Sequence, residues 1–123
     1  MKIPGAEKKL ELFFRSVVPD EASITIRPMF GNLAAFVNGN MFSGLYGDAL
    51  FLRLSGEGRT DLLSEKGAKV FEPMKGRPMK DYVCVPQEWL GSAGKITPWI
   101  LKSLAWSSTL PPKEKAKKRG AKK

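Results

Sequence analysis

Residue types that commonly carry out catalysis are scarce in this sequence, and those present are not arranged to work together. There is no histidine, so the side chain that most often acts as a general base near neutral pH is missing. The single thiol, Cys84, lies between two valines, a pattern typical of a strand in which cysteine packs as a small apolar side chain. No spacing pairs an acid with a base among the scattered carboxylates, which include Asp48, Glu57, Asp61, Glu65, Glu72 and Asp81. We therefore predict that the protein is not an enzyme, with no cofactor and no metal site.

Residues 55–60, with the sequence SGEGRT, precede an expected helix and superficially resemble a phosphate-binding loop. The lysine and hydroxyl residue that end such a loop are absent, and Glu57 would repel a phosphate. We interpret this segment as a plain connection between a strand and a helix.

Two arginines and three aromatic residues indicate a different chemistry, the recognition of another protein. Such side chains are enriched among the residues that dominate binding at protein interfaces. Alternation along the strands places them on one face, which gives the hypothesis of a contact site for a protein partner or a second copy of the chain: Arg27, Phe42, Tyr46, Phe51 and Arg53. The alternative is that each arginine covers apolar surface with its stem while its charged head stays in water.

The C-terminal end is a second candidate binding segment. Residues 113–123 carry seven basic residues and one acid, or +6 of the net charge of +9, which leaves +3 for residues 1–112. The basic residues are Lys113, Lys115, Lys117, Lys118, Arg119, Lys122 and Lys123. Such a run is typically disordered and can follow a phosphate backbone without recognising sequence, with dissociation constants of about 10⁻⁴–10⁻⁶ M. A purely solubilising tail is the alternative.

The elements that position these residues follow from the hydrophobic pattern. Apolar residues at helical spacing predict a helix over residues 6–18, and alternation predicts a strand over residues 23–27. Farther on, Asn38-Gly39 predicts a two-residue type I′ turn between strands, and Gly47-Asp48 predicts a second turn. Residues 33–54 are therefore expected to form a three-stranded antiparallel ribbon.

The two turns assign every side chain of this ribbon to a face, because directly opposed residues share a face and so do residues two apart. The expected pairs are Phe36 with Met41, Ser43 with Leu52, and Leu45 with Leu50. The predicted core face carries Ala34, Phe36, Met41, Ser43, Leu45, Leu50, Leu52 and Leu54. The predicted reverse face carries Leu33, Ala35, Val37, Phe42, Tyr46 and Phe51, with Arg53 opposite Phe42. This second face is too apolar for plain exposure, so we expect a later helix, a second subunit or a ligand to cover it.

The remaining elements complete an α+β fold. Thr60 as N-cap and Gly67 as stop predict a helix over residues 60–66, and strands are expected at residues 70–71 and 79–85. One helical turn is expected within residues 86–90, and Thr97-Pro98 predicts the start of a last helix that runs to residue 107. The order is helix, three or four strands, helix, two strands, helix. We predict an antiparallel meander of five or six strands flanked by three helices.

Length and composition predict one domain over residues 1–110 followed by a basic, disordered tail over residues 111–123. The lone cysteine excludes an intramolecular disulfide, and no apolar run approaches the ~20 residues of a membrane span. The N-terminus shows no apolar signal region. We expect a cytoplasmic protein without a membrane partner.

Three sequence motifs resemble one known family. The segments are RPMFG at residues 27–31, NGNMF at 38–42 and LFLR at 50–53, followed by Gly67, Val70-Phe71, YVCVP at 82–86 and the helix near Trp99. In this order they resemble the N-terminal domain of the TfoX/Sxy competence regulators, over roughly residues 8–107. The resemblance implies the helix-flanked antiparallel sheet described above.

The resemblance also implies a function in transcriptional control through protein contact, and it supplies no catalytic residues. Full-length competence regulators carry a second, helical C-terminal domain, where this sequence has thirteen mostly basic residues. We therefore expect a stand-alone, non-catalytic regulatory module. The alternative is a nucleic-acid-binding accessory protein that acts through its basic tail.

Overall fold

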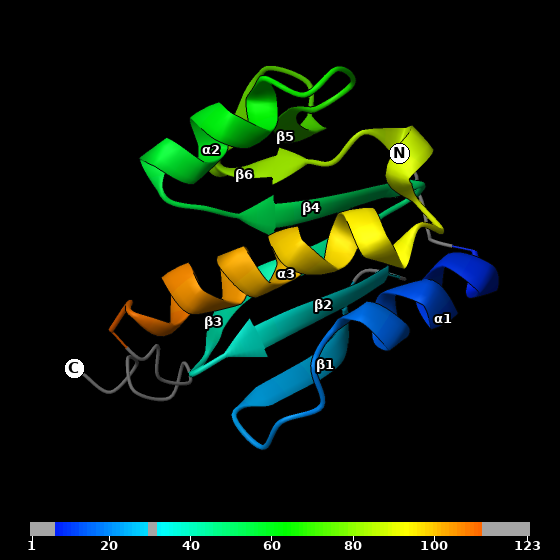
Figure 1. Ribbon diagram of the computed structural model, residues 1–123, viewed down its shortest axis with the longest axis vertical. Helices are drawn as coiled ribbons and strands as arrows, with labels where there is room; N and C mark the ends of the chain where they lie inside the picture. Colours follow the sequence, from blue (N-terminus) through cyan, green and yellow to red (C-terminus); the bar gives the residue numbers. More distant parts are fainter. Residues whose placement is uncertain (1–6, 30–31, 112–123) are drawn as a thin grey trace.

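The computed structural model describes residues 7–29 and 32–111, which form three helices and one antiparallel sheet (Figure 1). The elements are α1 (Lys8–Val17), β1 (Ile24–Met29), β2 (Asn32–Val37), β3 (Asn40–Tyr46), β4 (Ala49–Arg53), α2 (Gly56–Leu63), β5 (Lys69–Met74), β6 (Arg77–Cys84), the 3₁₀ turn η1 (Gln87–Trp89) and α3 (Ala93–Ser108). The strand order is β1-β2-β3-β4-β6-β5. The predicted α+β class and order of elements are confirmed. The chain departs from sequential order only at the end, where β6 pairs with β4 and β5 becomes the edge.

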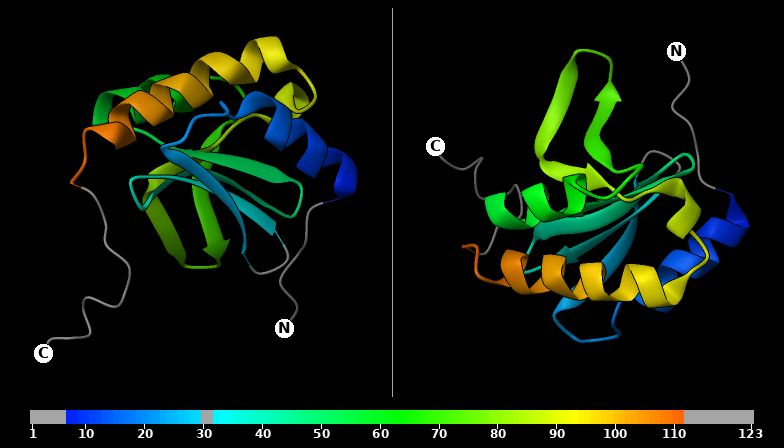
Figure 2. Two further views of the ribbon diagram at one scale, coloured as in Figure 1. Left: turned by 90° about the horizontal axis from the view of Figure 1, so that it is seen from below. Right: turned by 45° about the horizontal axis from the view of Figure 1, so that its top comes forward.

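All three helices lie on one face of the sheet, and the main core fills the space between the two layers (Figure 2). Phe14 and Val17 of α1 meet Ile96 and Ile100 of α3 in this core, together with apolar side chains of the strands. The helical pattern predicted over residues 6–18 is confirmed for the residues described. The apolar stripe of α1 packs the helix against the core.

Both predicted turns are present. Asn38 and Gly39 have φ values of 52° and 80°, as a type I′ turn requires, and Gly47 has a φ of 63°. The predicted pairs are also confirmed: Phe36 with Met41, Ser43 with Leu52, and Leu45 with Leu50. The turn residues therefore fix the connectivity of the ribbon correctly.

The assignment of faces was nevertheless wrong for half of the ribbon, because β3 contains a bulge. Ala35 pairs with Ser43 while Phe36 pairs with Met41, so Phe42 is an extra residue without a partner on β2. The bulge reverses the alternation at this point, and Phe36 and Leu52, predicted on one face, lie on opposite faces. The helix-covered core receives four residues predicted on the reverse face: Leu33, Ala35, Val37 and Phe42. Three predicted core residues lie instead on the helix-free side: Ala34, Phe36 and Met41.

Helix α3 stabilises the bulge directly. The hydroxyl oxygen of Ser103 lies 2.6 Å from the carbonyl oxygen of Phe42 and 2.7 Å from that of Arg53, and it can donate its proton to either. Ser103 is fully buried, so the bond replaces hydration that the bulged backbone has lost. One polar side chain of α3 thereby joins the helix layer to β3 and β4.

Two helix starts differ from the predictions. Helix α2 begins at Gly56 and not at residue 60, because Ser55 is the N-cap and its hydroxyl accepts a hydrogen bond from the Gly58 N–H at 3.1 Å. Helix α3 begins at Ala93, which leaves Pro98 inside the helix. Ile96 is fully buried, and we attribute the earlier start to its packing in the core, which outweighs the local signal of proline.

The basic tail and the residues Phe30 and Gly31 of the first motif lie outside the described residues. Within residues 7–29 and 32–111, no helix has the length and apolar character needed to cross a bilayer.

Candidate functional site

The face of the sheet opposite the helices is the candidate site, and we call it the open face. Among the described residues, no helix lies against it (Figure 2). The β5–β6 hairpin bends toward this side, as the left view of Figure 2 shows, and shields the half formed by β4 and β6. The half formed by β1, β2 and the start of β3 has no such cover in the described part of the chain.

The shielded half contains a cluster of four aromatic rings, Tyr46, Phe51, Phe71 and Tyr82, which we call the aromatic cluster. Phe51 and Phe71 are stacked with their centroids 4.2 Å apart, and Tyr82 meets Phe51 edge-on at 5.6 Å. Tyr46 meets Phe71 edge-on at 5.6 Å. The two edge-on contacts have the geometry that aromatic pairs prefer. The apolar surface that the sequence left without a partner is therefore partly covered by the chain's own hairpin.

Both tyrosine hydroxyls of the aromatic cluster donate to backbone carbonyls. The Tyr82 hydroxyl donates to Met41 across β4 at 3.0 Å, and the Tyr46 hydroxyl donates to Pro73 at 3.3 Å. Burial raises the pKa of Tyr82, and nearby Arg53 partly opposes this shift. The two hydroxyls attach the hairpin to the sheet and are already engaged, which suits a structural role for this half of the face.

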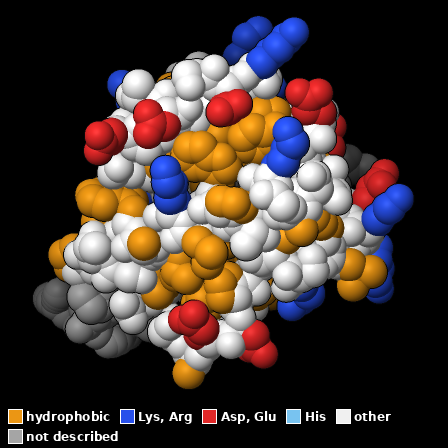
Figure 3. Space-filling view, viewed as in Figure 1, with side chains coloured by type: hydrophobic (Ala, Val, Ile, Leu, Met, Phe, Trp, Pro, Cys, Tyr) orange, Lys and Arg blue, Asp and Glu red, His pale blue; other side chains and the backbone are white. Residues whose placement is uncertain are grey.

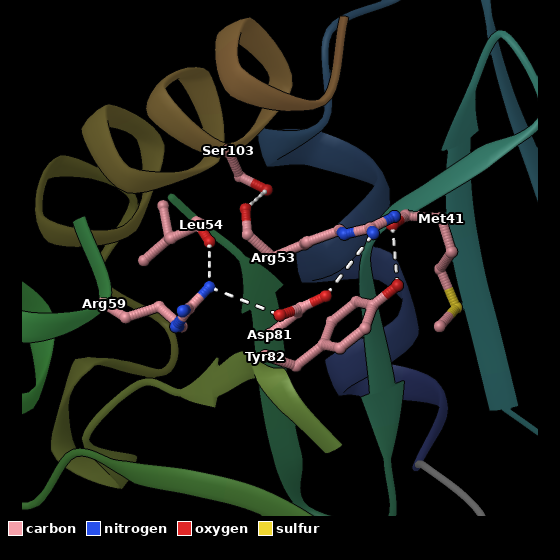
Figure 4. A network of polar contacts seen from close by, with 7 residues as sticks. All are labelled: Met41, Arg53, Leu54, Arg59, Asp81, Tyr82 and Ser103. Atoms are coloured by element: carbon pink, nitrogen blue, oxygen red, sulfur yellow. Dashed lines mark hydrogen bonds and ion pairs between the residues drawn. The ribbon is translucent and has the colours of Figure 1, made fainter. Parts of the chain in front are cut away.

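Arg53 belongs to a polar network at the edge of the cluster (Figure 4). The Asp81 carboxylate lies 3.5 Å from Arg53 and 3.4 Å from Arg59, whose guanidinium also donates to the Leu54 carbonyl at 2.9 Å. The Arg53 guanidinium also lies 5.7 Å from the centre of the Tyr82 ring. Because the Asp81 side chain is 54% exposed, the ion pairs contribute little free energy. Their effect is to align β4, β6 and α2.

The uncovered half of the open face carries a contact between an arginine and a phenylalanine. The Arg27 guanidinium lies over the Phe36 ring, 4.1 Å from its centre. Arg27 is exposed, Phe36 and the neighbouring Met41 are partly exposed, and Phe36 pairs directly with Met41. A cation over an aromatic face is weakly attractive at an exposed site and favours this orientation of the ring.

The five residues predicted as one contact site are therefore separated. Tyr46, Phe51 and Arg53 come together around the hairpin, Arg27 lies with Phe36 on the other half of the face, and Phe42 is fully buried beneath the helices. Phe36 and Met41, which the structure places on the open face, were missed because the bulge has no clear signature in the sequence.

An open hollow of ≈ 1070 Å³ lies where α1, the β3–β4 turn and β5 meet. Its lining is mixed in charge and includes Glu7, Tyr46, Asp48, Lys69, Glu72 and Cys84. Within the described ranges, no three residues among His, Cys, Asp and Glu are grouped closely enough to hold a metal ion.

Cys84 is expected to be an unreactive thiol in the folded protein. It is 5% exposed, and burial raises its pKa from the ordinary value of 9.0 to about 11, although nearby Lys69 acts in the opposite direction. Because the thiolate is the reactive form, a disulfide reagent at pH 8 should label native protein far more slowly than protein unfolded in guanidinium. Rapid labelling of the native protein, with circular dichroism unchanged, would contradict this assignment.

The same shift has a consequence for stability against pH. The folded state keeps the Cys84 proton up to about pH 11, whereas the unfolded state loses it near pH 9.0. The contribution of the protonated Cys84 thiol to the free energy of unfolding is fully present below pH 9 and is lost as the pH rises toward 11. In denaturant titrations, replacing Cys84 with serine should reduce the loss of stability at alkaline pH. The part of that loss due to Tyr82 should remain.

The comparison with protein families gives one match. The family model described as the TfoX N-terminal domain matches residues 18–106, which is most of the chain. The match begins just after α1 and includes the whole sheet, α2 and nearly all of α3. No curated protein matches the chain.

Proposed function

The chain belongs to the TfoX N-terminal domain family, and on this premise we propose that it is a non-catalytic regulatory module that acts by contact with another protein. The contact surface is the uncovered half of the open face, centred on Arg27, Phe36 and Met41. Through that contact the module takes part in transcriptional control, as the resemblance to competence regulators implies.

The observation that carries this proposal is the exposed pair of Arg27 and Phe36. Most of the apolar side chains of the sheet are packed under helices or under the β5–β6 hairpin, whereas Phe36 keeps part of its ring in solvent beneath a guanidinium. Arginine and large aromatic residues are the types that most often dominate binding at protein interfaces. A ring held in place before binding also loses less conformational freedom when a partner arrives.

Two features of the described residues support a module without catalysis. The thiol of Cys84 holds its proton well above neutral pH, so it is a poor nucleophile there. The Asp81 carboxylate is already engaged in ion pairs with Arg53 and Arg59, so its charge is used within the domain. The sequence has no histidine to act as a general base.

The test compares two changes of an apolar side chain to aspartate. Phe36→Asp removes the ring and places a carboxylate beside Arg27, whereas Leu12→Asp makes a similar change at a side chain on α1 that is 60% exposed. We expect Phe36→Asp to weaken association at least tenfold, whether with a second copy in sedimentation velocity or with a purified partner. Leu12→Asp should leave association unchanged.

Circular dichroism and thermal unfolding serve as the control, and both variants should give the folded signal. If the intact protein and both variants associate equally well, the uncovered half of the open face is not the contact surface. If Leu12→Asp alone weakens association, the contact lies on the helical side and the proposal is wrong.

A second candidate function rests on the charge distribution of the sequence. Residues 113–123 hold +6 of the net charge of +9, enough for non-specific attraction to nucleic acid. These residues lie outside the described part of the chain. Changing their seven basic residues to glutamine should reduce the salt dependence of duplex binding if the tail provides it.

A further inference from the structure

The tip of the β5–β6 hairpin carries positive charge that the domain leaves unpaired. Lys75, Arg77 and Lys80 are all exposed, and none of them forms an ion pair with another described residue. The nearby acids are already engaged. Glu72 accepts a hydrogen bond from the Gly76 N–H at 2.6 Å, and Asp81 lies against Arg53 and Arg59. Residues 72–80 thus hold three cations and one carboxylate, that of Glu72, none of them in an ion pair, which gives this segment a net charge of +2.

This hairpin also extends beyond the sheet. Strand β6 pairs with β4 through Tyr82, Val83 and Cys84, and two backbone bonds flank these pairs, from the Leu54 N–H to the Asp81 carbonyl and from the Val85 N–H to the Leu50 carbonyl. Residues 72–80, which we call the arm, therefore form a ribbon of two strands joined to each other. The right view of Figure 2 shows the arm projecting from the body, and Figure 3 shows Lys and Arg side chains at the top edge of the view from the helix side.

The arm exposes apolar side chains between its charges. Met74 is 59% exposed and Met79 is 36% exposed, on either side of the Lys75-Gly76 turn. Pro73 and Pro78 lie one on each strand and lack the N–H that a further strand would need. The prolines disfavour docking of a protein by strand addition. An occupant must instead contact the side chains of the ribbon.

We propose that the arm binds duplex nucleic acid, with Lys75, Arg77 and Lys80 on the phosphates and the apolar tip at a groove. A ribbon of two strands fits the major groove of B-form DNA, and proteins that bind the minor groove often insert an apolar side chain such as methionine or proline between base steps. Three unpaired cations within six residues match the closely spaced charges of a phosphate backbone. This surface is separate from the protein-contact surface at Arg27 and Phe36.

The experiment measures binding of the full-length protein to a fluorescent DNA duplex as a function of salt. The arm variant is Lys75→Gln/Arg77→Gln/Lys80→Gln. Its matched control is Lys8→Gln/Lys9→Gln/Arg15→Gln, which removes the same charge from exposed positions on α1. Both sets are also made in a full-length chain whose tail cations at residues 113–123 are glutamine.

We expect the arm variant to weaken binding by about tenfold or more at low salt. The slope of log affinity against log salt should fall by about 0.9 for each phosphate that the protein no longer neutralises, or by up to roughly 2.7. The control should change neither quantity. The arm's effect should persist in the tail-neutral chain, which separates the arm from the tail.

A second measurement reports on the arm itself. An environment-sensitive dye on Met74→Cys, with Cys84 buried and unreactive, should change its emission on addition of duplex. Equal slopes for the arm variant and its control would overturn the proposal. So would binding that disappears with the tail cations alone, or polyglutamate that competes as well as unlabelled duplex does.

Discussion

Replacing Phe42 with aspartate is expected to unfold the domain. The Phe42 side chain is 0% exposed and packs in the helix-covered core at the bulge of β3. Removing a buried phenylalanine to alanine costs about 3–5 kcal/mol, and an unpaired buried carboxylate adds several more. A domain of this size is stable by only about 5–15 kcal/mol. Circular dichroism at 25 °C should show loss of most of the native signal.

The control for Phe42→Asp is Phe36→Asp, six residues earlier on the neighbouring strand. Phe36 lies on the open face with part of its ring in solvent, and Arg27 can form an ion pair with the new carboxylate. This variant should stay folded, with a free energy of unfolding within about 1–2 kcal/mol of the parent. If the two variants were equally stable, the assignment of faces around the bulge would be wrong.

Replacing Gly44 with alanine is expected to destabilise the aromatic cluster. A Cβ atom at Gly44 would lie 2.6 Å from Cζ of Phe51 and 3.1 Å from the carbonyl oxygen of Leu33. The Phe51 ring cannot simply turn away, because it is stacked on Phe71 and met edge-on by Tyr82. Overpacking of this kind costs about 1–3 kcal/mol, which would lower the melting temperature by roughly 5–15 °C.

Two further variants test the cause of that destabilisation. Gly94→Ala makes the same change in α3, where the added Cβ would have nothing within 4 Å, and it should leave stability equal or slightly higher. Gly44→Ala combined with Phe51→Leu should cost less than the two single changes added together, since the smaller side chain makes room. Additive effects would mean that contact with the Phe51 ring is not the source of the strain.

The sequence predicted the architecture well because its strongest signals are local. The Asn38-Gly39 turn has the positive φ angles that its residues favour, and the amphipathic pattern of α1 depends only on side chains within one helix. Such signals need no knowledge of distant contacts. The start of α3 was mistaken for the opposite reason, since the burial of Ile96 depends on α1 and the sheet.

The candidate site was harder to predict because it depends on one extra residue in β3. Side chains alternate with a period of two along a strand, so a single bulge exchanges the faces of the residues on one side of it relative to those on the other. Tyr46, Phe51 and Arg53 lie after the bulge and stayed on the predicted side, whereas Phe42, at the bulge, moved to the core. The part played by Ser103 could not be inferred, because its partners are sixty-one and fifty residues away.

The order of the last two strands has a consequence for how the chain folds as it leaves the ribosome. Strand β5 is made before β6 but has no place on β4, so the edge of β4 stays unpaired until Cys84 has emerged. We expect the hairpin of β5 and β6 to close through local contacts and then to dock as one piece, because this is faster than two separate long-range pairings. On this order the aromatic cluster is completed last, after the first four strands have met.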